Sequence, residues 1–276
     1  AAAFPTDNHA VDMLVDRHDV LWAATPQGLW RLAQGTAKQV RLGDIRSLAL
    51  RGDVLWVRTR NDGLLRIEGD RISTHPDAPA CKGSWVATGA AGSLYTSCAE
   101  GIWRWDADVS RWERISDAIG VGPLHVDRND AVWFGARDGL TRWHRGRTDV
   151  RRGALMLPDW RIRAFHRDSA GDLWLGTFSS GLVRLHDGVV HSIGAPEGLA
   201  IDGPTAVLLG PGGDLFVGGN PGGLARWAWN RGLTGRWTQD SGLPGLGVWA
   251  LAADPRQPQG FWVGGDQGLA WWEDGA

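Results

Sequence analysis

The stretch DSAGDLWLGTFSSGLVR, residues 168–184, holds a pattern that returns along the whole chain. It places a Trp inside a short apolar run, followed by small residues, a polar loop, and Gly-Leu with an Arg close behind. Six other segments carry the same phrase, and their aromatic residues are Trp22, Trp56, Tyr95, Trp133, Phe216 and Trp262. Together with Trp174, these anchors are spaced 34 to 46 residues apart, so seven units fill the 276 residues.

The length of the unit and its alternation of apolar runs and turns predict the fold. A repeat of about 40 residues, built from short apolar runs and turns, is typical of a four-stranded β-propeller blade. We therefore expect an all-β fold: a single seven-bladed β-propeller domain over residues 1–276, with four-stranded antiparallel blades. The last unit ends after its third strand, so the N-terminal segment Ala2–Thr6 is expected to complete that blade as its outer strand, which removes an open sheet edge. The many Trp residues on third strands are expected to fill the space between the splaying blades.

Composition excludes several classes of protein. The chain has 40 Gly and 13 Pro, which disfavour long helices, and no apolar run long enough to insert in a membrane. A net charge of −2 without a block of basic residues argues against a nucleic-acid partner, since such binding depends on phosphate neutralisation. The chain starts Ala-Ala-Ala-Phe without Met, which is the appearance of a terminus left by signal-peptide cleavage. A start chosen arbitrarily within a longer protein would look the same.

A candidate ligand face follows from the blade topology. With the strands of a blade called A to D in chain order, the D-to-A and B-to-C connections emerge at one end. Residues there that the repeat does not require are candidates for binding, and aromatic residues beside Arg and Asp suit a small polar or carbohydrate-like ligand. These candidates are Arg46, Arg58, Arg60, Trp85, Arg137, Trp160, Arg161, Phe178, Trp249 and Asp266. A plugged central channel is the alternative explanation.

The two cysteines, Cys81 and Cys98, fall in the D-to-A and B-to-C connections of one unit. Counted from the hairpin between them, they stand opposite each other. A disulfide is expected if the protein is exported, and two reduced buried thiols are the alternative.

Signals for catalysis are weak, and we expect no catalytic residues, no metal site and no cofactor. The eight His show no metal-ligand spacing. His125 and His166 occupy equivalent first-strand positions, where a structural role is favoured over a metal or acid–base pair. Asp16, Asp127, Asp168 and Asp254 recur after first strands and are interpreted as turn-capping side chains.

The unit resembles the two-component regulator propeller repeat, whose phrase is Asp-x-x-Gly-x-Leu-Trp-Ile/Val-Gly-Thr followed by Gly-Gly-Leu. The match is sharp over residues 168–184, and it is weakest in the third unit, where Tyr95 replaces Trp. The joins Glu197-Gly198-Leu199 and Ser241-Gly242-Leu243 also look like that family's links between blades. The resemblance covers all seven units, but such a repeat specifies a fold far more strongly than a ligand.

This resemblance implies a periplasmic or extracytoplasmic sensor propeller, of the kind attached to membrane-bound histidine kinases or diguanylate cyclases. A small-molecule or oligosaccharide ligand and a downstream membrane-bound signalling domain are the partners it implies. Two alternatives stay open: a streptogramin-lyase-like propeller enzyme with a His/Mg²⁺ site, and a scaffold that binds another protein.

Overall fold

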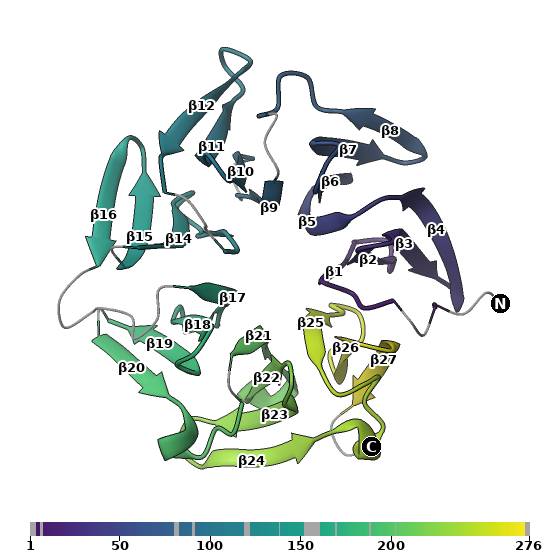
Figure 1. Cartoon of the computed structure of the whole chain (residues 1–276), viewed down its shortest axis with the longest axis vertical. Coiled ribbons are helices and arrows are strands. Elements are labelled where there is room, and N and C mark those ends of the chain that lie inside the picture. The colour runs from purple at the N-terminus through teal and green to yellow at the C-terminus, as the bar shows by residue number, and fades with distance from the viewer. Residues whose placement is uncertain are drawn as a thin grey trace. The chain divides into compact units, whose positions relative to one another are not determined.

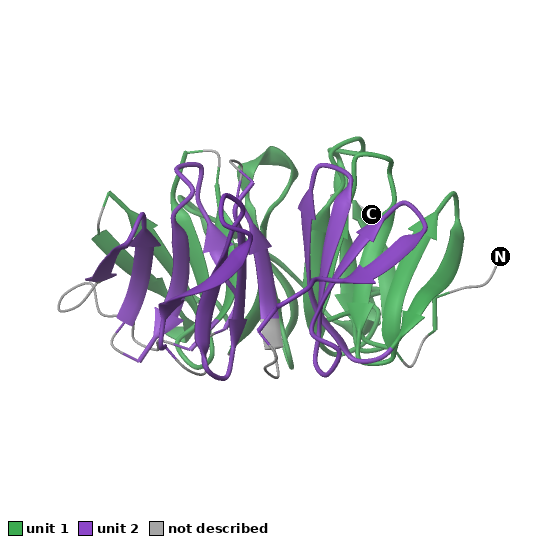
Figure 2. Ribbon diagram, turned by 90° about the horizontal axis from the view of Figure 1, so that it is seen from above, with its two compact units in different colours: residues 1–42, 163–276 green, residues 43–162 purple. Residues whose placement is uncertain are grey.

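The computed structural model describes residues 4–5, 8–79, 83–89, 92–118, 122–137, 139–151, 161–168, 170–187, 189–201 and 203–273. It forms seven antiparallel sheets, each built from strands consecutive in the chain (Figure 1). The chain divides into two compact units: residues 1–42 with 163–276 (unit 1) and residues 43–162 (unit 2), which Figure 2 colours green and purple. The all-β, seven-bladed propeller class is confirmed, whereas the single domain stays a prediction.

Unit 1 holds four blades. Blade 1 consists of β1 (Asp12–Val15), β2 (Leu21–Thr25), β3 (Gly28–Ala33) and β4 (Thr36–Leu42). Blade 5 consists of β17 (Ile162–Arg167), β18 (Leu173–Thr177), β19 (Leu182–His186) and β20 (Val189–Ile193). Blade 6 consists of β21 (Pro204–Leu209), β22 (Leu215–Gly219), β23 (Gly223–Ala228) and β24 (Gly232–Trp237). Blade 7 consists of β25 (Val248–Ala253), β26 (Gly260–Gly265) and β27 (Gly268–Glu273). Three short 3-10 helices lie in the connections between strands of this unit: η2 (Ala195–Glu197), η3 (Pro211–Gly213) and η4 (Gln239–Ser241).

Unit 2 holds three blades. Blade 2 consists of β5 (Ile45–Arg51), β6 (Val54–Thr59), β7 (Leu64–Glu68) and β8 (Arg71–Thr74). Blade 3 consists of β9 (Gly83–Thr88), β10 (Leu94–Cys98), β11 (Gly101–Asp106) and β12 (Arg111–Ser116). Blade 4 consists of β13 (His125–Val126), β14 (Val132–Ala136), β15 (Gly139–His144) and β16 (Arg147–Arg151).

The core of each unit lies between neighbouring blades. Trp174 of blade 5 packs in one cluster with Val207 and Trp227 of blade 6. Strand β18 is buried along its whole length because both of its faces are covered, which explains its unbroken apolar sequence. The third-strand Trp residues follow the expectation only in part: Trp227 is 6% exposed, but Trp229 is 51% exposed. Trp229 lies instead under the guanidinium of Arg184, 4.1 Å from its ring centre, so a cation covers one face of the indole.

The Asp residues after first strands cap turns, as predicted, and three of them also bind the Trp of the next strand. Asp127 Oδ1 accepts hydrogen bonds from the backbone N–H of Asn129 (2.9 Å) and Ala131 (3.1 Å), while Oδ2 accepts one from Trp133 Nε1 (3.0 Å). Equivalent indole bonds join Trp22 to Asp16 at 2.9 Å and Trp174 to Asp168 at 2.8 Å. We call this arrangement the Asp–Trp bracket.

The predicted outer strand of blade 7 is not present among the described residues, and residues 2, 3 and 6 of its segment lie outside them. The described part of the chain gives this blade three strands, in the order β25-β26-β27. Of residues 2–6, only Phe4 and Pro5 are described, and neither belongs to a strand. Phe4 contacts Trp30 of blade 1 edge to face, with ring centres 5.4 Å apart. Phe4 therefore contacts blade 1 through its side chain. Counting the strands of each repeat cannot predict such a contact.

Candidate functional site

The candidate site lies at the end of the blades where first strands begin and second strands connect to third strands; we call this the loop end. In unit 1 it is centred on Trp249, near the start of β25. The indole N–H of Trp249 donates to Asp266 Oδ1 at 2.5 Å, and Asp266 Oδ2 accepts from the backbone N–H of Gly247 at 2.7 Å. The ring of His9 lies over Trp249, with centroids 5.3 Å apart. The structure thus brings together two predicted residues, and Asp266 fixes the orientation of the indole.

Phe178 provides an exposed aromatic surface at the same end of blade 5. It follows β18 directly and keeps 47% of its surface exposed, which is unusual for a large apolar side chain. The guanidinium of Arg163, near the start of β17, lies 5.2 Å from the ring centre. Burial lowers the pKa of Arg163. Arg163 was not among the predicted site residues, although its position near the start of a first strand places it at the loop end.

Contacts between blades 5, 6 and 7 connect these two aromatic groups. A Cβ placed on Gly203 would lie 2.7 Å from the carbonyl oxygen of Phe178, so the chain before β21 passes close beneath this loop. Thr205 Oγ1 donates to the carbonyl oxygens of Gly218, at 3.2 Å, and of Val248, the neighbour of Trp249. Phe178, Thr205, Trp249 and Asp266 therefore lie on consecutive blades of unit 1 at the loop end, and we call this set of residues the loop-end strip.

In unit 2, Asp44 brings two predicted arginines together. Its Oδ2 lies 2.6 Å from Arg46 Nη2 and 3.5 Å from Arg60 Nη1. The backbone N–H of Arg60 also donates to the Asp44 carbonyl oxygen at 2.8 Å. One carboxylate therefore holds two cations on adjacent strands of blade 2 and leaves the group with an excess of positive charge.

Arg58 differs from the surface role predicted for it. Its side chain is 0% exposed, and its Nη2 lies 3.4 Å from the carbonyl oxygen of Pro79. Burial lowers the pKa of this guanidinium to about 10. The reason is its place in the strand: β6 is buried from Leu55 to Thr59, so the side chain enters the interior of unit 2.

The other predicted residues lie apart from these groups or outside the described residues. Trp85 is half-buried in β9, and its carbonyl oxygen accepts a hydrogen bond from Thr96 Oγ1 at 2.9 Å. Arg137 and Arg161 are exposed, and Trp160 lies outside the described residues. Cys98 is disulfide-bonded, and the only other cysteine of the chain, Cys81, also lies outside the described residues.

His166, one of the two candidate acid–base histidines, forms a hydrogen bond between blades 5 and 6. His166 Nε2 accepts a hydrogen bond from the backbone N–H of Leu209 at 3.0 Å, so the neutral ring carries its proton on Nδ1. Burial lowers the pKa of His166 to about 4. The ring therefore joins blades 5 and 6 as a neutral acceptor. Within the described residues, no group of three or more His, Cys, Asp or Glu could hold a metal ion.

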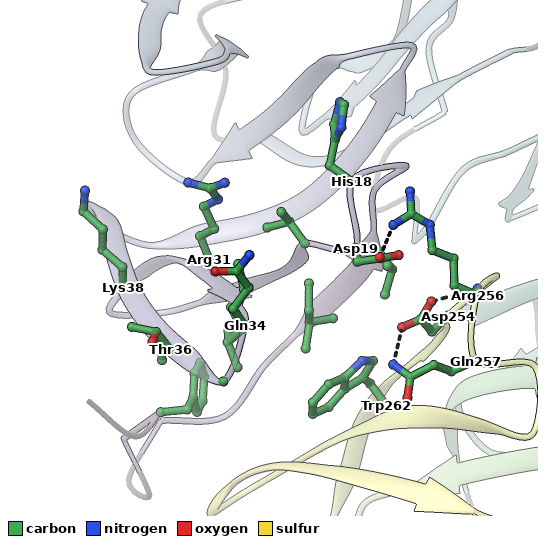
Figure 3. A pocket seen from close by; sticks show the side chains of 18 residues that line it. His18, Asp19, Arg31, Gln34, Thr36, Lys38, Asp254, Arg256, Gln257 and Trp262 are labelled. Carbon is green, nitrogen blue, oxygen red and sulfur yellow. Dashed lines mark hydrogen bonds and ion pairs between the residues drawn. The ribbon is translucent and has the colours of Figure 1, made fainter. Parts of the chain in front are cut away.

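A cavity of about 1060 Å³ lies elsewhere in unit 1, between blades 1 and 7 (Figure 3). It opens at the opposite end of these blades, where β1 turns into β2 and β3 turns into β4. None of the residues predicted for the ligand face lines it. This cavity was not predicted, because its signal lies in the sizes of strand residues and not in the loop residues that differ between repeats.

Solved structures share this fold over nearly the whole chain. The extracellular domain of the one component system BT4673 from B. thetaiotaomicron superposes with a TM-score of 0.80 at 17% identity, covering 98% of this chain and 39% of that one. The extracellular domain of the hybrid two component system BT3049 from B. thetaiotaomicron gives 0.75 at 13% identity, covering 96% and 40%. This chain thus spans about two fifths of either.

An enzyme has the same fold. Virginiamycin B lyase from Staphylococcus aureus superposes with a TM-score of 0.77 at 13% identity, covering 97% of this chain and 96% of the lyase. No protein-family profile and no curated protein matches the chain. Among the described residues, no helix has the length and apolar character needed to cross a membrane. At these identities the likeness establishes the propeller fold, which sensors and a lyase share.

Proposed function

We propose that this chain is a non-catalytic, extracytoplasmic ligand-sensing propeller, which belongs to a longer protein with a membrane-bound signalling domain. The loop-end strip is the proposed binding surface for a small polar or carbohydrate-like ligand. The observation that carries the proposal is the exposed ring of Phe178 under Arg163, on the same surface as an indole held by Asp266. An aromatic face can stack on the apolar side of a sugar ring, while the cation binds hydroxyl or carboxylate oxygens.

The extracytoplasmic location is supported by the disulfide at Cys98, since disulfides persist in oxidising compartments. The extracellular sensor propellers that share the fold point the same way. The lyase likeness supports the alternative, a catalytic propeller.

Calorimetric titration of the full chain against a panel of oligosaccharides tests the binding proposal. Phe178→Ala is expected to reduce the affinity of any ligand found by about fivefold, as stacking on one aromatic ring is typically worth on the order of 1 kcal/mol. Val189→Ala is the matched control, because Val189 lies in the same blade with 52% of its surface exposed but outside the strip. Equal loss in both variants, or no loss in Phe178→Ala, would contradict the proposed surface.

The non-catalytic role has its own test. We expect no ring-opened product when the chain is incubated with Mg²⁺ and quinupristin, the compound bound in a structure of the lyase. Ring opening by elimination leaves the mass unchanged, so liquid chromatography with fragment-ion mass spectrometry would detect such a product. Its formation at a catalytic rate would replace the sensor proposal by the lyase alternative.

A further inference from the structure

The cavity between blades 1 and 7 has an apolar floor. Val15, Leu21, Leu32 and Ala37 of blade 1 line it together with Trp262 of blade 7. In Figure 3, Trp262 lies on the same side as Asp254, Arg256 and Gln257, across from the β3–β4 hairpin that carries Gln34 and Lys38. Its volume of about 1060 Å³ reaches the upper end of small-molecule sites, which are concave and mostly apolar with a few polar groups.

Residue size at equivalent positions explains why this space is open. In blade 6, Leu215 pairs with Trp227, which pairs with Leu233, and Trp227 fills the space beside Trp174 of blade 5. In blade 1, the equivalent positions are Leu21, Leu32 and Ala37. Leu32 thus stands where Trp227 closes the blade 5–blade 6 interface. In blade 3, the counterparts of Leu32 and Ala37 are Trp105 and Trp112, which pair with each other.

Trp262 lacks the hydrogen bond that the equivalent Trp residues make in blades 1, 4 and 5. It is the counterpart of Trp174, whose indole N–H donates to the Asp of the preceding turn. In blade 7 that Asp is Asp254, but its Oδ2 accepts from Gln257 Nε2 at 3.0 Å. The described residues provide no acceptor for the indole N–H of Trp262. Trp271 holds the ring in place edge to face, with centroids 5.4 Å apart.

Two carboxylates of the rim, Asp19 and Asp254, are held by neighbouring residues. Arg256 forms an ion pair with Asp19 and also donates to the carbonyl oxygen of Arg17. Asp254 accepts from the backbone N–H of Arg256 at 3.0 Å in addition to Gln257. Arg31 and Lys38 also line the cavity, and no ion pair within the described residues neutralises them. The walls thus combine apolar surface, the indole donor and two cations, which favours a ligand with hydrogen-bond acceptors and no positive charge.

We propose that this cavity is a second ligand site, which takes a small, flat molecule with a hydrogen-bond acceptor and no positive charge. The ring of the ligand packs between Trp262 and Leu32, and its acceptor receives the Trp262 indole N–H. The site is independent of the loop-end strip, because it lies at the other end of the blades. Either site can therefore fail its test without affecting the other.

Titration of the full chain with Nile red, a flat uncharged dye with a carbonyl acceptor, tests the proposal. The dye emits strongly in apolar surroundings and at wavelengths away from Trp emission. We expect saturable binding of one equivalent. Leu32→Trp, which installs the residue that closes the blade 5–blade 6 interface, is expected to abolish it. Leu233→Trp places the same ring at a 38% exposed position outside the cavity and is expected to bind like the parent.

A second variant keeps the test decisive if Leu32→Trp fails to fold. Trp262→Phe keeps an aromatic wall and removes the donor, so affinity is expected to fall about threefold to tenfold, the range of one net hydrogen bond. Binding that does not saturate, that survives Leu32→Trp, or that is unchanged by Trp262→Phe overturns the proposal.

Discussion

The Asp–Trp bracket of blade 4 offers a measurable test of what holds a blade together. Replacing Asp127 by Asn keeps the side-chain shape and the Oδ1 acceptor for the two backbone N–H groups. It substitutes an NH₂ group for the Oδ2 that receives the Trp133 indole N–H at 3.0 Å. Asp127 is 6% exposed and Trp133 8%, so solvent does not replace the lost bond.

The expected cost follows from the charge and burial of the acceptor. A hydrogen bond to a charged group is worth about 1.5–3 kcal/mol, so Asp127→Asn should lower the free energy of unfolding by about 2 kcal/mol. For a chain of this size, that is a drop in melting temperature of roughly 4–8 °C. Burial alone raises the pKa of Asp127, but the bonds from Trp133, Ala131 and Asn129 and the charge of Arg142 outweigh it and lower the pKa overall. The stabilisation is therefore present above the ordinary carboxyl pKa and is lost as pH falls through the lowered value.

A double-mutant cycle isolates the bond from other effects of the substitutions. Thermal unfolding followed by circular dichroism would compare the parent, Asp127→Asn, Trp133→Phe and the double variant. Since Trp133→Phe already removes the donor, Asp127→Asn should cost about 1–2 kcal/mol less in that background. Asp108→Asn, at an exposed turn, is the control and should leave stability unchanged. A coupling near zero would refute the reasoning, because the indole bond would then contribute nothing beyond the shape of the turn.

Three further outcomes are expected. The pKa of His166 is about 4 in the fold against 6.5 in the unfolded chain, so thermal melts should show full stability above pH 6.5 and a loss of about 3 kcal/mol toward pH 4. His166→Gln should reduce this dependence of stability on pH. Intact mass measured with and without reduction should show one disulfide between Cys81 and Cys98. Cys98→Ala should lower the free energy of unfolding by about 3 kcal/mol and abolish the effect of reductant on the melting temperature. Gly265→Ala should destabilise the chain by about 2 kcal/mol or more in denaturant titration, because its Cβ would overlap the backbone oxygen of Pro244.

The strands could be predicted from the sequence because their signals are local. Every aromatic anchor, from Trp22 in β2 to Trp262 in β26, lies in the second strand of its blade. The turn Asp residues were predicted for the same reason, since an Asp side chain bonds to backbone only two to four residues away. The indole bond of the bracket was missed, although its spacing of six residues recurs in three blades.

The candidate site was predictable only in part, because it depends on contacts between distant segments. Blade topology placed Trp249 and Asp266 at one end, and the structure joins them. The same argument could not show that Arg58 turns into the interior, since one residue's shift along a strand reverses its side. It also could not place Phe4, whose contact is with a ring 26 residues away in the sequence.

Differences between the repeats are most informative where they coincide. Blade 7 lacks the indole bond that brackets Trp22, Trp133 and Trp174, and the surface facing Trp262 lacks the large side chain that closes the blade 5–blade 6 interface. The unfilled apolar space reduces stability, and one larger side chain at Leu32 would fill it. Trp262 is partly exposed, so its indole N–H is open to an acceptor in the cavity. A ligand that fills the space and accepts this hydrogen bond accounts for the two departures together.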